Sequence, residues 1–276
     1  MLPGVNDITE GVLAFLRPRR KENGGYGATP TLPATIEDTY HALCILHTLG
    51  IKADLAAGED KSLQDYLFRM KETGWKGTRT FFQLLSTCCL AGVAISHEKA
   101  ATFVKRRLTE TKDLVERYYC ARIVREVLDA ATITGMEMAG GLSRIPWRDA
   151  TELWMILYLL NGTQTGEEPS RRRDLIGWLQ ACQNYDGGFG FLPGTTSFVE
   201  NCHTCLRGLA LLDAVPRDPG ACRAFILACQ TATGGFARIN RAAAFLDSTW
   251  HAIAALSLLP RGIHDNSAHG SHCRPG

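Results

Sequence analysis

The chain has 276 residues, of which 45% are hydrophobic and 21% charged, enough for one large domain or two small ones with a substantial core. No apolar run approaches the roughly 18 residues needed to cross a bilayer, which excludes a membrane-spanning helix. The net charge of +2 neither favours nor excludes nucleic acid, and the short basic clusters at residues 17–21 and 171–173 are typical of solvated surface. We therefore expect no nucleic-acid partner.

The cysteines indicate a cellular compartment. The chain has ten of them, and its first twenty residues carry Asp7 and Glu10 in place of the basic start and apolar stretch of a signal peptide. Thiols in a protein without such a signal are expected to stay reduced, so the sequence predicts a cytoplasmic location.

Helical periodicity extends along most of the chain. Apolar spacing and breakers predict helices at 8–16, 37–49, 62–70, 80–93, 98–108, 113–131, 147–160, 171–183, 200–213, 218–230 and 246–259. Pro260 ends the last of them, and the Gly-, Ser-, His- and Pro-containing tail at 261–276 is expected to be disordered. We predict one domain over residues 1–260.

A turn of two glycines and an aromatic residue recurs, each time at the same distance before a helix. It stands at residues 24–26, 187–189 and 234–236, and leads into the segments at 39–43, 202–206 and 249–253. Counted from the first copy, the second lies 163 residues later and the third lies 210 residues later. Paired glycines permit a positive-φ turn, and a shared internal spacing indicates a repeat architecture. A degenerate copy includes Gly140 and Gly141.

The helices form pairs with one more apolar member, starting near residues 37, 80, 113, 149, 200 and 247. Helices that are apolar all round are buried, and those with one apolar stripe lie at the surface. Six buried helices alternating with about six outer ones predict an all-α protein, an α/α toroid around a central cavity. An open solenoid is the alternative, but it requires polar caps at its ends.

The glycine–aromatic turn followed by a helix resembles the prenyltransferase and squalene cyclase repeat. The resemblance covers roughly residues 5–260. It implies an enzyme that holds an isoprenoid substrate in the central cavity, with its chemistry at the N-terminal ends of the inner helices. Helix N-termini carry unsatisfied N–H groups and the positive end of the helix dipole, which suits such a site.

The protein prenyltransferases of this family carry a zinc site of Asp-x-Cys on one inner helix and His on a later one. By resemblance, Asp149 and His203 stand at ligand positions, but Thr151 replaces the cysteine. A neutral hydroxyl is a poor zinc ligand, so Cys202 or Cys205 would have to substitute. Zinc or magnesium is thus open, and the alternative is core cysteines with a histidine at the rim.

The class II cyclases of the family carry Asp-x-Asp-Asp-Thr at the start of an inner helix, where the middle Asp protonates the substrate. Residues 35–39, Thr-Ile-Glu-Asp-Thr, resemble this motif and make Glu37 and Asp38 the candidate acid pair. Adjacent carboxyls in a dry cavity favour a protonated state, although ordinary helix capping explains the same residues. Asp149, His203 and Asp247 are the next catalytic candidates.

Aromatic residues near the starts of inner helices complete the predicted site. Electron-rich rings stabilise carbocations, so Tyr40, Trp154 and Trp250, together with Cys202, are expected to contact the substrate. Three functions remain open: acid-initiated cyclisation of a polyprenyl substrate, which we favour, prenyl transfer with an altered metal site, and a non-catalytic toroid that binds a lipid or a protein. Prenyl transfer would imply a partner subunit.

Overall fold

The structure, a computed structural model, describes residues 5–51, 61–73, 77–128, 146–160 and 169–260. These residues form eleven α-helices, one 3-10 turn and isolated β-bridges, which confirms the all-α prediction. The helices are α1 Val5–Leu16, α2 Ile36–Thr48, α3 Lys61–Glu72, α4 Thr78–Leu90, α5 His97–Glu110, α6 Leu114–Glu126, α7 Ala150–Leu160, α8 Pro169–Ala181, α9 Val199–Leu211, α10 Pro219–Ala228 and α11 Leu246–Leu258, and the 3-10 turn is η1 Arg17–Arg19.

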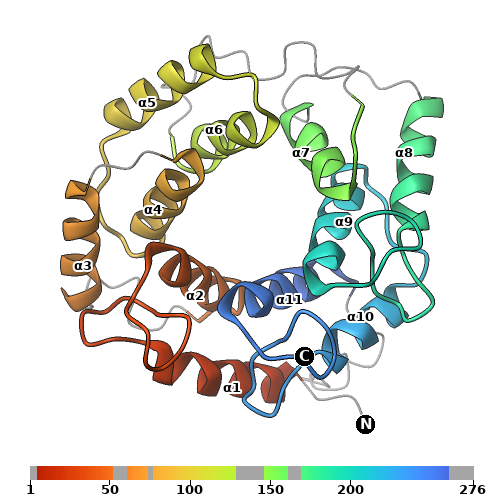
Figure 1. Ribbon diagram of the computed structural model, residues 1–276, viewed down its shortest axis with the longest axis horizontal. Helices are drawn as coiled ribbons and strands as arrows, with labels where there is room; N and C mark the ends of the chain where they lie inside the picture. The colour runs from red at the N-terminus through yellow and green to blue at the C-terminus, as the bar shows by residue number, and fades with distance from the viewer. Residues whose placement is uncertain (1–4, 52–60, 74–76, 129–145, 161–168, 261–276) are drawn as a thin grey trace, which may run out of the picture.

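Two concentric rings of helices make the toroid (Figure 1). In the inner ring α2, α4, α6, α7, α9 and α11 each pack against the next, and α11 packs back against α2, so the ring is closed. Helices α1, α3, α5, α8 and α10 lie outside it. Closure excludes the open solenoid. The tail at 261–276 and the degenerate glycine turn at Gly140 lie outside the described residues.

The predicted inner helices agree with the observed ones to within two residues at most ends. The main difference is α6, which was predicted to run to residue 131 but ends at Glu126. Val127 leaves the helical region with φ −125°, and its N–H caps the carbonyl of Ile123. Apolar side chains at Val127 and Leu128 continue the buried stripe past the helix end. The apolar pattern alone therefore predicted a helix longer than the observed one.

The three repeated glycine turns each lie directly against an outer helix, α3, α10 or α1. Gly24, Gly187 and Gly234 have φ between +85° and +88°, and a Cβ on Gly234 would lie 2.0 Å from the carbonyl oxygen of Gly11 on α1. The N–H of Phe236 donates to Thr249 Oγ1 at 2.9 Å, joining the third turn to α11. Only glycine permits both the conformation and this close approach.

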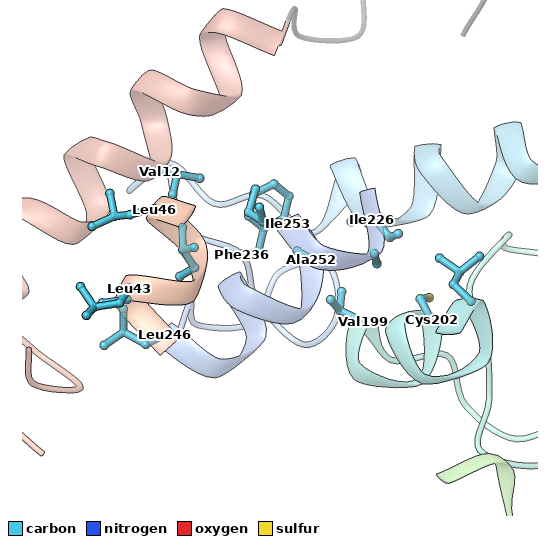
Figure 2. Packing of buried hydrophobic residues seen from close by; sticks show 14 of the residues in the cluster. Val12, Leu43, Leu46, Val199, Cys202, Ile226, Phe236, Leu246, Ala252 and Ile253 are labelled. Atoms are coloured by element: carbon cyan, nitrogen blue, oxygen red, sulfur yellow. The ribbon is translucent and has the colours of Figure 1, made fainter. Parts of the chain in front are cut away.

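Apolar side chains fill the space between the two rings. Figure 2 shows part of this core, in which side chains from α1, α2, α9, α10 and α11 meet, among them Val12, Leu43, Val199, Ile226 and Ile253. The opposite faces of the same inner helices turn toward the ring centre and are free to carry polar and aromatic groups. Within the described residues, no helix is both long and apolar enough to cross a membrane.

Candidate functional site

A cavity of about 330 Å³ lies inside the inner ring, within the size range of ligand pockets. Every inner helix contributes an adjacent pair of residues to the lining, at its fifth and sixth positions. The pairs are Tyr40–His41, Phe82–Gln83, Tyr118–Tyr119, Trp154–Met155, His203–Thr204 and Trp250–His251. Each pair stands at the same position in its helix, so the twelve side chains lie at one level around the ring. We call this set the belt, and six of its members are Phe, Tyr or Trp.

One turn before this belt, a second set of residues forms the rim of the cavity at the helix N-termini. The lining includes Arg79, Thr151, Glu200 and Asp247 at this level. Glu37 stands at the same helical position but is not part of the lining, because it turns to Arg79, with 2.6 Å between its Oε1 and Arg79 Nη2. The rim is therefore rich in carboxylates.

The two carboxyls that the motif singled out lie beside the cavity and do not line it. The Glu37 side chain is 51% exposed in its ion pair with Arg79. Asp38 accepts a hydrogen bond from Thr35 Oγ1 at 2.6 Å, and burial raises its pKa. The expectation that one of them points into the cavity is not met, because Glu37 pairs with Arg79 and Asp38 with Thr35, and neither carboxyl is part of the lining. Thr35 accepts from the Asp38 N–H, which is a helix cap.

Glu200 is the rim carboxyl that the motif search missed. Burial raises its pKa, the Asp247 charge adds to the rise, and Arg238 opposes it from 3.1 Å. Its Oε2 is covered and has no hydrogen-bond partner. A signal was present in the sequence, since Glu200 precedes His203 by three residues, as Asp247 precedes Trp250 and Glu37 precedes Tyr40.

Three histidines meet in the belt, of which only His203 was predicted. Its Nδ1 lies 2.9 Å from His251 Nδ1, and His41 stacks on Trp250 with centroids 5.3 Å apart. One ring of the pair must carry its proton on Nδ1 and the other on Nε2, so one Nε2 holds a free lone pair. The repeat would have revealed His41 and His251, which are 210 residues apart.

Burial keeps these imidazoles neutral. It lowers the pKa of His41 to about 4 and that of His251 to about 3, and it lowers the pKa of His203 well below its usual value. For all three, burial is the largest cause. Neutral imidazoles can accept a proton inside the cavity.

These shifts predict a loss of stability in acid. Between pH 6.5 and about 4 the unfolded chain protonates these histidines and the folded chain does not, so unfolding is favoured as pH falls. Each histidine contributes about 1 kcal/mol per pH unit in that window. Urea unfolding at pH 7 and pH 4.5 measures the loss, which should be smaller in His41→Gln. An equal loss in that variant would contradict the prediction.

The predicted aromatic residues Tyr40, Trp154 and Trp250 all line the cavity. Trp250 contacts His41, His203 and Tyr40 with centroids 5.1 to 6.0 Å apart. Their contact with a substrate remains a prediction. Sequence reasoning missed Phe82, Tyr118 and Tyr119, which the glycine turns do not mark.

The deep end of the cavity, one turn beyond the belt, is formed by Arg122 and Arg207. Arg122 is 8% exposed and forms a two-fold ion pair with Glu126, at 2.8 and 2.7 Å. Tyr158 donates to the same carboxylate at 2.9 Å. The desolvation cost of burying the Arg122 and Glu126 charges is therefore offset by their ion pair and hydrogen bonds. This end carries two cations of the lining, Arg122 and Arg207, whereas its acids, Glu200 and Asp247, lie at the rim together with Arg79.

Cys202 is corrected by the structure. It is fully buried between the rings, where Figure 2 shows it among core side chains beside Val199, and it is not part of the cavity lining. On α9 the cavity face passes through Glu200, His203 and Arg207, so Cys202 falls on the outward side. Burial raises its pKa well above the usual value, so the thiol stays protonated.

The proposed metal ligands do not fit zinc or magnesium. Asp149 Oδ1 accepts the N–H groups of Thr151 and Glu152, at 2.8 and 3.0 Å, and so caps α7. His203 uses its Nδ1 on His251, and Thr151 offers only a hydroxyl. In the described part of the chain, no three His, Cys, Asp or Glu side chains stand close enough to share a metal ion.

Comparison with known proteins agrees with the closed double ring. A model of the prenyltransferase alpha-alpha toroid domain matches residues 5–218 and 217–273. A search of curated proteins finds no match. The fold is one of isoprenoid-related enzymes. Because the matches span most of the sequence and the rings have the toroidal arrangement, the chain belongs to the prenyltransferase alpha-alpha toroid family.

Proposed function

We propose that this protein binds an isoprenoid chain in its central cavity and cyclises it by an acid-initiated reaction. The observation that carries the proposal is Glu200, a carboxyl with a raised pKa on the wall of an aromatic cavity. A raised pKa enlarges the fraction of the carboxyl that carries a proton, which is the form that a Brønsted acid needs. Asp247, which lines the rim beside it, is the second candidate acid. Glu37 and Asp38 remain candidates through the family resemblance.

The reaction is a proton transfer followed by ring closure. The Glu200 carboxyl gives its proton to a terminal alkene, and the resulting cation is attacked by the next double bond of the chain. The faces of Tyr40, Trp154 and Trp250 stabilise the moving positive charge. The free Nε2 of the His203–His251 pair then accepts a proton from the cyclised cation. The histidine pair releases this proton to solvent and Glu200 takes one up from solvent, so the net change is an isomerisation.

The test uses farnesyl and geranylgeranyl diphosphate in D₂O. Acid initiation puts one solvent deuterium on the product carbon skeleton and keeps the diphosphate, and mass spectrometry detects both. Release of diphosphate without deuterium would indicate ionisation of the substrate and overturn the acid mechanism. Binding without conversion of either substrate would indicate a non-catalytic toroid.

The proposal includes a reducing, cytoplasmic location. The nine cysteines in the described part of the chain are free thiols, which supports it. Prenyl transfer through a metal is not part of the proposal, because the donor set at Asp149 and His203 does not fit.

A further inference from the structure

Three side chains from neighbouring inner helices meet near the deep end of the cavity. The rings of Tyr118 on α6 and Trp154 on α7 lie edge to face, with centroids 4.8 Å apart. The guanidinium of Arg207 on α9 covers the Trp154 ring at 4.4 Å. All three line the cavity, and each carries a hydrogen-bond donor.

The donors of this cluster lack acceptors. Tyr118 is 1% exposed and Trp154 9%, yet the Tyr118 hydroxyl and Trp154 Nε1 have no hydrogen-bond partner. Arg207 forms no ion pair or hydrogen bond with the residues that the structure describes; its contact is the Trp154 ring. Buried polar groups in proteins are nearly always paired, so the two buried donors of Tyr118 and Trp154, with the half-buried Arg207 guanidinium beside them, call for an acceptor.

The charge at this end selects the acceptor. Arg122 forms a two-fold pair with Glu126, and the same carboxylate also attracts Arg207, so two guanidinium groups share one negative charge and one positive charge is left over. Burial raises the pKa of Tyr118 to about 12, so its hydroxyl keeps its proton and can donate. A guanidinium, a phenol and an indole N–H together fit an oxygen that carries negative charge.

We propose that Tyr118, Trp154 and Arg207 form a subsite for the negatively charged oxygen terminus of the ligand, a carboxylate or a phosphate. The proposal rests on the proposed function, in which an isoprenoid chain occupies this cavity, and adds its orientation. Arg207 follows Glu200 by seven residues on α9, which places it about 10 Å deeper. The charged end of the ligand therefore lies deep, and its hydrocarbon end lies at the Glu200 acid.

Calorimetric binding of three C15 probes tests this subsite: farnesol, farnesoic acid and farnesyl phosphate. The protein should bind at least one of the two anionic probes about tenfold or more tightly than the alcohol, and which one it prefers distinguishes a carboxylate from a phosphate. Arg207→Gln should abolish the preference, and Tyr118→Phe, which keeps the ring, should reduce it severalfold.

Two matched variants locate the effect. Arg79→Gln removes a cation at the rim and Arg173→Gln removes one at the exposed surface of α8, and the preference should survive both. Equal binding of alcohol and anions, or a preference lost in Arg79→Gln and kept in Arg207→Gln, would overturn the subsite. That result leaves isoprenoid binding intact, whereas failure of all three probes to bind would refute the proposed function itself.

Discussion

Replacing Glu200 by glutamine is expected to lower turnover by at least about a hundredfold, the usual contribution of a general acid. The amide keeps the size of the side chain and its contact with Arg238 but has no acidic proton to give. Substrate affinity, measured by calorimetry, should stay within a few-fold of the unchanged protein. The activity of the unchanged protein should fall as pH rises through the raised pKa of Glu200, because only the protonated form is active.

The matched control is Glu37→Gln, the same substitution at the equivalent position of α2. Glu37 pairs with Arg79 and is not itself part of the cavity lining, so its loss should reduce turnover only a few-fold. If Glu37→Gln is inactive and Glu200→Gln is active, the acid is the residue that the family motif indicates. Circular dichroism of both variants establishes that neither result comes from unfolding.

The largest effect on stability is expected from Gly234→Ala. Gly234 has φ +88°, which costs a residue with a Cβ about 1–2 kcal/mol. The new methyl would also meet the Gly11 carbonyl oxygen at 2.0 Å, so α1 must move away from the turn. We expect a total loss of about 3–5 kcal/mol in the free energy of unfolding, of the size seen for overpacking plus strain. Urea unfolding monitored by circular dichroism measures it.

Gly194→Ala separates backbone strain from collision. Gly194 has φ +78°, but nothing lies within 4 Å of the position its Cβ would take. Its replacement should therefore cost only the conformational part, about 1 kcal/mol. Equal losses in the two variants would mean that the collision of the new methyl with α1 adds nothing to the cost of the substitution.

The fold was predictable because the repeat consists of residues with strong local conformational preferences. Gly187 and Gly234 at positive φ and the apolar faces of α9 and α11 produce turns and helices wherever they occur. The site was less predictable. Glu37 is drawn to Arg79, 42 residues later, by an ion pair that no local pattern reveals.

The direction in which each side chain points from its helix explains the other differences between the predicted and the observed site residues. Cys202 and His203 are neighbours, yet one packs between the rings and the other enters the cavity. A helix turns by about 100° per residue, so the direction of each side chain depends on how the whole helix is rotated in the ring. The belt pairs fix that rotation, and Glu200 becomes recognisable as a cavity residue only once it is known.

The contact between α11 and α2 also has a consequence for how the protein folds. These helices lie side by side, although about 200 residues of chain separate them. Neighbouring pairs such as α2 and α4 can form as the chain is synthesised, but the cavity has no complete wall until α11 is in place. Until then the side of α2 that packs against α11 lacks its partner, and we expect chains that stop short of α11 to expose apolar surface and to aggregate more readily.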